Sequence, residues 1–123
     1  MLKVADEFIV IDSGSTDATL QICQQFGLTV HHHPYTSHGA QMNYATSLAC
    51  HDWVLCMDSD EILDDEVVAA ILALKTGDDP DPARAWRLPR YWFVLGEEVR
   101  TIYPVSSPDF PVRLFNRSVA RFN

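Results

Sequence analysis

Short hydrophobic runs that end in polar turns alternate with helix-like segments along the first half of the chain. Residues 8–11, 28–31 and 53–57 are apolar and too short for helices, so they predict strands, the last one buried on both faces. Residues 17–26 and 40–49 carry apolar side chains at helical spacing, which predicts two crossover helices. The alternation predicts an α/β layer with parallel strand pairing.

The second half of the chain has a different pattern. An acidic start at residues 64–66 precedes a helical periodicity that runs through Leu74. A loop rich in Gly, Asp and Pro follows at residues 76–82. Beyond this loop we predict short strands at residues 86–88, 91–94, 112–115 and 119–122.

Composition narrows the classes of partner. The chain has 123 residues, is 47% hydrophobic and carries a net charge of −8. This acidity argues against nucleic acid or anionic lipid as the main partner, and a phosphate-bearing ligand would need a cation beside it. The sequence has no apolar run of membrane-spanning length, so we expect a cytoplasmic protein, or one held peripherally at the inner face of the cell membrane. Three cysteines, Cys23, Cys50 and Cys56, are widely spaced in the sequence. This spacing indicates free thiols that serve as small core residues.

Two aspartates follow the strand predicted at residues 53–57. Asp58 and Asp60 are separated by one residue, so an extended exit would turn both carboxylates to the same side. Hard cations such as Mg²⁺ or Mn²⁺ take oxygen ligands of this kind, together with substrate phosphates and water. The alternative is an acidic turn with solvated carboxylates that precedes a helix.

A second polar turn follows the strand predicted at residues 8–11. Asp12 could accept hydrogen bonds from a nucleoside, Ser13 offers a hydroxyl, and Gly14 permits a tight turn. The next helix start adds free backbone N–H groups. For residues 15–17 helix capping alone is a sufficient explanation.

Four blocks of the chain resemble one known family. Residues 8–17, 39–45, 52–61 and 108–117 together resemble family 2 glycosyltransferases with the GT-A fold, above all bacterial lipopolysaccharide-core and related sugar transferases. The resemblance implies a partial GT-A, Rossmann-like sheet, mostly parallel, with helices on both faces. It also implies transfer of a sugar, with inversion, from a nucleotide-sugar such as a UDP-sugar to a glycan or lipid-linked acceptor of the cell envelope.

The same resemblance assigns roles to single residues. Asp12 and Ser13 would contact the nucleotide, Asp58 would lie near the ribose or the metal, and Asp60 would be the main ligand of Mg²⁺ or Mn²⁺. Gly39 and Asn43 fall where the family places residues beside the nucleotide, although Asn43 could instead face solvent. Many relatives carry a basic residue at or near this position. Met42 is uncharged, so it weakens the expected attraction for phosphate.

A catalytic base should come from farther along the chain, across the cleft. Asp109 is the candidate, with a plain loop aspartate as the alternative. Glu61 is the rival, unless it only begins the next helix. Arg90, Arg113 and Arg117 could contact phosphate or acceptor, or be surface cations.

Two departures from the family pattern concern the ends of the chain. Only residues 1–7 precede the first predicted strand, where relatives carry a further central strand, and the sequence stops before their acceptor-side helices. We therefore expect one incomplete domain over residues 1–123, with a nucleotide-binding half at 1–75 and the start of an acceptor half at 83–123. Such a chain would show unpaired backbone groups beside the missing strand and little turnover, unless a homodimer partner supplied the strand.

Three other readings compete with sugar transfer. An apolar strand followed by Asp58 and Asp60 also begins haloacid-dehalogenase-type phosphatases, but Ile62 stands where that motif needs Thr or Val. A non-catalytic nucleotide-binding or assembly module would keep the sheet and lose the chemistry. Residues 31–33 are consecutive histidines that point to alternate faces, which argues against a zinc site.

The aromatic residues Trp86, Tyr91, Trp92, Phe93 and Tyr103 could stack on a sugar or pack a core.

Overall fold

The computed structural model describes residues 4–77, 80–102 and 105–123, so Tyr103 lies outside it. A first β-α-β unit is formed by β1 (Val10–Asp12), α1 (Thr19–Gln25) and β2 (Val30–His32). β1 and β2 pair in parallel, as the sequence predicts. Gly27 ends α1 in the left-handed region, with φ 67°, a conformation that glycine adopts without a steric cost.

The second sheet is antiparallel, and this corrects the prediction of a mostly parallel sheet. It contains β3 (Trp53–Leu55), β9 (Val112–Asn116) and β4 (Ala85–Arg87) in the order β3-β9-β4. β9 runs antiparallel to both neighbours and pairs with β3 along one of its edges. β1–β2 is thus the only parallel pair among the described residues.

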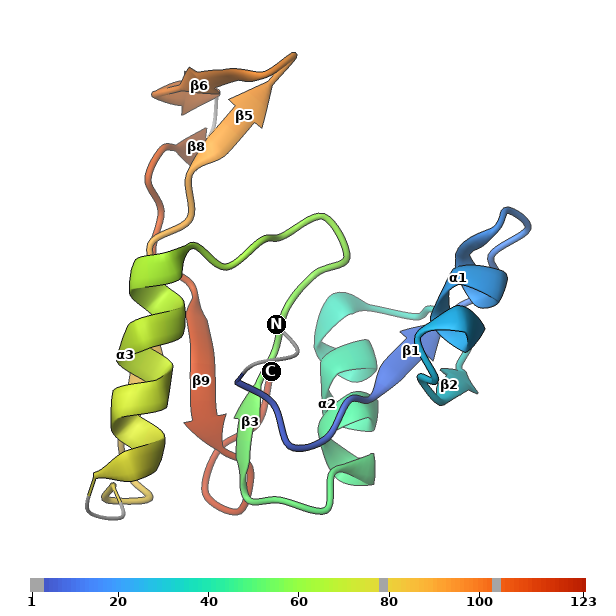
Figure 1. Cartoon of the computed structure of the whole chain (residues 1–123), viewed down its shortest axis with the longest axis horizontal. Coiled ribbons are helices and arrows are strands. Elements are labelled where there is room, and N and C mark those ends of the chain that lie inside the picture. Colours follow the sequence, from blue (N-terminus) through green and yellow to red (C-terminus); the bar gives the residue numbers. More distant parts are fainter. Residues whose placement is uncertain (1–3, 78–79, 103–104) are drawn as a thin grey trace.

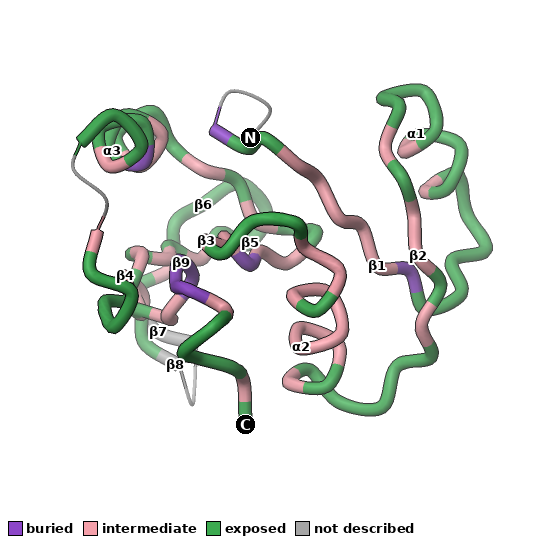
Figure 2. The backbone as a smooth tube through the Cα atoms, turned by 90° about the horizontal axis from the view of Figure 1, so that it is seen from below, coloured by how far each residue is buried: buried purple, intermediate pink, exposed green. Residues whose placement is uncertain are grey.

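β1 and β3 belong to separate sheets and do not pair with each other (Figure 1). Each has a strand partner on one edge only within the described part of the chain, β2 for β1 and β9 for β3. Helix α2 (His38–Leu48) lies between the β1–β2 pair and β9 in both views (Figures 1 and 2).

The two longer helices begin at side-chain caps. Ser37 Oγ accepts a hydrogen bond from Ala40 N at 3.2 Å at the start of α2. Asp64 Oδ1 accepts one from Val67 N at 2.7 Å at the start of α3 (Asp65–Thr76), whose first turn is acidic, as predicted. No helix of the described residues is long and apolar enough to span a membrane.

The buried core is small and centres on β9 and α3 (Figure 2). Within the described residues, the buried hydrophobic side chains are those of Val4, Cys56, Ile71, Leu114 and Phe115. The prediction that residues 53–57 are buried on both faces is therefore wrong: each residue of β3 is only half-buried.

The remaining strands form short ribbons. β5 (Trp92–Val94) and β6 (Glu97–Val99) make a hairpin that projects from the body, and β7 (Thr101–Ile102) pairs with β8 (Val105–Ser106) (Figure 1). The strand predicted at residues 119–122 is absent. The backbone turns there instead, because Val119 N and Ala120 N both donate to Asn116 O.

Candidate functional site

The residues after β3 form a closed turn. Glu61 N donates to Asp58 O at 3.1 Å, and Asp58 N donates to Glu61 Oε2 at 3.1 Å. The backbone is fixed just before the turn, where Cys56 N donates to Arg113 O at 2.9 Å. Glu61, the rival candidate for the base, thus uses one carboxylate oxygen to hold Asp58 in place.

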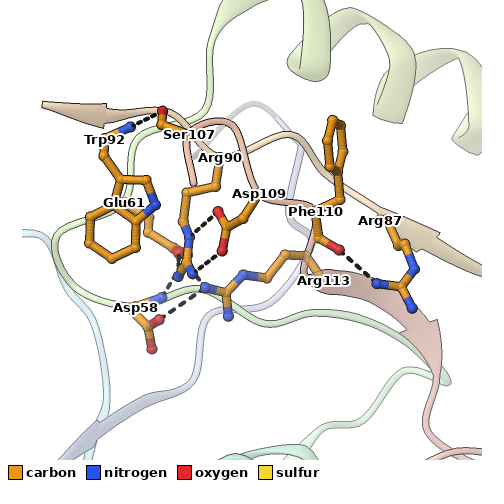
Figure 3. A network of polar contacts seen from close by, with 9 residues as sticks. All are labelled: Asp58, Glu61, Arg87, Arg90, Trp92, Ser107, Asp109, Phe110 and Arg113. Atoms are coloured by element: carbon orange, nitrogen blue, oxygen red, sulfur yellow. Dashed lines mark hydrogen bonds and ion pairs between the residues drawn. The ribbon is translucent and has the colours of Figure 1, made fainter. Parts of the chain in front are cut away.

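Oppositely charged side chains alternate around this turn (Figure 3). Arg113 Nη2 donates to Asp58 Oδ2 at 2.9 Å and also to Glu61 Oε1. Arg90 Nη1 donates to the same Glu61 oxygen at 3.1 Å. The result is a continuous row of ion pairs that runs from Asp58 through Arg113, Glu61 and Arg90 to Asp109.

Asp109 is held by a two-pronged contact. Arg90 Nε donates to Asp109 Oδ1 at 3.0 Å and Arg90 Nη2 to Asp109 Oδ2 at 2.6 Å, while the backbones of the two residues form a β-bridge. The hydrogen-bonded guanidinium lowers the pKa of Asp109 below its usual range, and the carboxylate in turn raises the pKa of Arg90. A lowered pKa makes Asp109 a weaker proton acceptor for as long as Arg90 is bound to it.

Asp58 and Asp60 present oxygen atoms that suit a hard cation. Asp58 Oδ1 makes no hydrogen bond among the described residues and lies 3.9 Å from His38 Nδ1 on α2. The Asp60 side chain is exposed and has no hydrogen-bond or ion-pair partner within the described part of the chain. Magnesium in particular is commonly held by one or two carboxylates together with phosphates and water, so this pair fits such an ion.

Asp12 lies in its own tight loop at the end of β1. Its carboxylate accepts hydrogen bonds from Gly14 N at 2.8 Å, from Ser15 N at 3.0 Å and from the Ser15 hydroxyl. The Ser15 hydroxyl, followed by these backbone N–H groups, lowers the pKa of Asp12. Asp12 is buried and ionised, and it fixes the loop that carries Ser13.

The structure does not gather the three aspartates around one point. In residues 4–77, 80–102 and 105–123, no group of three or more His, Cys, Asp or Glu side chains lies close enough to hold one metal ion. The Asp12 loop follows β1 and the Asp58 turn follows β3, and these two strands lie on either side of α2 (Figure 1).

Gly39 and Asn43 both contact the last residues of the chain. Asn43 Nδ2 donates to Phe122 O at 2.8 Å, and Phe122 N donates to Asn43 Oδ1 at 2.9 Å. Gly39 lies directly against the backbone of Asn123, where a side chain would have no room. Their assignment to the nucleotide stays a prediction, and in this structure the Asn43 amide is already engaged.

Sequence reasoning gave no role to Gln41, which joins the exits of β1 and β2. Gln41 Nε2 donates to Ser13 Oγ at 3.0 Å, and Gln41 Oε1 lies 2.9 Å from His33 Nδ1. The ring of His33 stacks on Tyr44 at 4.1 Å between centroids. The position of Gln41 within block 39–45 was the available signal for this contact.

The aromatic cluster is packed only in part. Trp86 packs against Trp53 with 5.3 Å between ring centroids, and Trp92 lies under the Arg90 guanidinium at 4.8 Å. These two indoles serve packing. Tyr91 and Phe93 are exposed.

Comparison with known proteins gives a consistent family. Residues 3–103 match the sequence profile described as Glycosyl transferase family 2. The chain is 31% identical over 121 residues to an uncharacterized glycosyltransferase of Rickettsia prowazekii, and 29% identical over 121 residues to one of Rickettsia typhi. Each alignment covers 98% of this chain and 40% of the relative.

A shorter alignment reaches a higher identity. An uncharacterized glycosyltransferase of Rickettsia felis is 42% identical over 65 residues, which are 53% of this chain and 23% of that protein. The chain therefore spans well under half the length of these curated relatives. No solved structure matches the chain significantly.

Proposed function

The chain belongs to glycosyltransferase family 2, and on that premise we propose that it binds a nucleotide-sugar donor at the Asp58–Glu61 turn. Family 2 enzymes transfer a sugar from such a donor to an acceptor, and the family typically uses a divalent metal. The observation that supports the proposal is the pair of carboxylates that follow β3: Asp58 has one oxygen without a hydrogen bond among the described residues, and Asp60 is an exposed residue.

On the donor side, Asp60 and Asp58 would hold Mg²⁺ or Mn²⁺ with the diphosphate. When bound, the ion supplies charge neutralisation for the departing diphosphate. Without it, the acidic chain would repel a bare diphosphate, since the net charge is −8. Asp12 keeps the β1 loop closed, so that Ser13 and the backbone can face the nucleoside, with Gly39 and Asn43 nearby on α2. Uridine is the proposed base.

On the acceptor side, Asp109 is the proposed base for an inverting transfer to a glycan or lipid-linked acceptor, such as one in the lipopolysaccharide core. Arg90 binds both carboxylate oxygens and lowers the pKa of Asp109, so Asp109 would be a stronger base once Arg90 released one of them. Arg90 would then be free to turn to another anion. A carboxylate that stayed paired would serve only to position Arg90.

Calorimetric titration of the purified chain with UDP, in the presence and absence of Mn²⁺, tests the donor site. We expect saturable binding that requires the ion, and we expect Asp60→Asn to weaken it by ~10-fold or more, because a main metal ligand is lost. Asp52→Asn is the matched control, since Asp52 is an exposed aspartate whose nearest cation, Arg117, lies 4.0 Å away.

Other outcomes would select the competing functions. Hydrolysis of a phosphate ester that is lost in Asp58→Asn would favour the phosphatase. Binding of UDP that ignores both Mn²⁺ and Asp60 would favour a nucleotide-binding module without the chemistry. Absence of binding to both UDP and UDP-sugars would reject the donor site.

A further inference from the structure

Arg113 is the most buried member of the row of ion pairs and has no assigned role. Its side chain is 6% exposed, compared with 29% for Arg90 and 33% for Asp58. It lies on β9, whose backbone pairs with β3, and its own carbonyl accepts the hydrogen bond from Cys56 N. Both its backbone and its guanidinium therefore contact the segment that carries Asp58.

The contacts of Arg113 determine which oxygen of Asp58 is available. Arg113 Nη2 donates to Asp58 Oδ2, and the backbone N–H of Asp58 donates to Glu61 Oε2. Oδ1 is left without a hydrogen bond among the described residues, and the carboxylate cannot rotate without losing the Arg113 contact. A buried guanidinium that holds a carboxylate in one orientation is a typical outer partner of a metal or phosphate site.

The charges of the turn give Arg113 a second task. The carboxylates of Asp58 and Glu61 carry like charges and contact the same nitrogen, because Arg113 Nη2 donates to both. We propose that Arg113 is a positioning residue that acts as the internal counter-ion of this turn and presents Asp58 Oδ1 to the donor's metal ion. The inference rests on the proposed donor site.

The first test compares Arg113→Met, Arg113→Lys and the control Arg117→Met in UDP–Mn²⁺ calorimetry. Arg117 lies just after β9, and its side chain donates to His51 O, at the end of the strand away from Arg113. We expect ~10- to 100-fold weaker binding for Arg113→Met, the range found for residues that hold a metal ligand in place. Arg113→Lys should recover part of this loss, because lysine keeps the positive charge but lacks the planar set of N–H donors. Arg117→Met should bind within ~2-fold of the original chain.

A second measurement needs no nucleotide. The midpoint of urea unfolding is compared for Arg113→Met and for the same change in an Asp58→Asn, Glu61→Gln background, each with EDTA and with Mn²⁺. We expect the loss caused by Arg113→Met to shrink in the neutralised background, because the carboxylates no longer need a counter-ion. We also expect Mn²⁺ to restore part of that loss only where both carboxylates are present.

The outcomes separate this inference from the proposed function. If the original chain fails to bind UDP–Mn²⁺, the donor site is rejected, and the unfolding measurement still decides whether Arg113 serves the carboxylates. If the original chain binds and both Arg113 variants bind equally well, the inference is overturned. An equal loss of stability in both backgrounds, unaffected by Mn²⁺, would also overturn it, since Arg113 would then be a packing residue. If Arg113→Met does not fold, Arg113→Lys carries both measurements.

Discussion

At the scale of single residues, the charged side chains of this protein are held by specific partners more than by burial. Asp109 is gripped at both oxygens by Arg90, and Asp12 by the backbone and hydroxyl of its own loop. In both cases hydrogen bonds to the ionised form lower the pKa of the carboxyl group. The carboxylates therefore stay charged well into acid.

The first residue-scale prediction concerns Arg90→Met. The variant should return the pKa of Asp109 toward its ordinary value and cost about 1–2 kcal/mol of unfolding free energy at neutral pH, because a hydrogen-bonded charge pair is lost. Carboxyl ¹³C shifts followed against pH measure the pKa, and urea unfolding measures the stability.

The sign of the pH dependence follows from the lowered pKa. Stabilisation by the pair is fully present above the ordinary carboxyl range of about pH 4, and it is lost as the pH falls through the lower pKa of the folded protein. The stability difference between the original chain and Arg90→Met should accordingly narrow in strong acid. A difference that is constant from pH 7 to the acid limit would contradict this account.

A second prediction concerns the loop after β1. Ser15→Ala removes the hydroxyl that contributes most to the lowered pKa of Asp12. We expect that pKa to rise while remaining below its ordinary value, because the Gly14 and Ser15 amides still donate. Ser47→Ala, which removes an exposed hydroxyl on α2, is the control and should leave the Asp12 titration unchanged.

At the scale of elements, local signals in the sequence located the helices and several strands, although the strand expected at residues 119–122 is absent, and they did not reveal which strands pair. The acidic start of α3 was predicted from local sequence, and the structure confirms it. The Asp64 cap and the turn at Gly27 are local features of the same kind. The partner of β3 could not be predicted, because β9 lies more than fifty residues away and short apolar runs do not reveal which neighbour they pair with.

The site follows the same division. Placing Asp58 and Asp60 at a strand exit needed only the apolar run before them, and the structure has that exit. The pairing of Arg113 and Arg90 with these carboxylates depends on the antiparallel return of β9, so the sequence offered both arginines only as general anion contacts. Asn43 was assigned from its position in a block, whereas its contact with Phe122 depends on tertiary structure.

An element-scale prediction tests how the segment after β9 is attached to α2. Asn43→Ala removes two hydrogen bonds to the Phe122 backbone and should cost about 1–3 kcal/mol. Hydrogen exchange at the Phe122 amide should accelerate, while exchange within β9 changes much less. Ser47→Ala, one turn along the same helix, should leave Phe122 protected.

At the scale of the whole molecule, the two halves inferred from the sequence are joined by more than the connecting chain. β3 belongs to the first half and β9 to the second, and they share one sheet. The row of ion pairs links the same halves, from Asp58 to Asp109. A division of labour between a donor half and an acceptor half stays a prediction, and any such division would act across this shared sheet.

The unpartnered edges of β1 and β3 have a consequence for how copies of the protein behave together. Along those edges, the backbone groups have no strand partner among the described residues, and an extended segment of another molecule could pair with them. These two strand edges therefore favour association between molecules. Electrostatic repulsion opposes that association, because each molecule bears a charge of −8. Added salt weakens that repulsion and does not affect the strand edges, so ionic strength sets the balance between monomers and self-associated molecules.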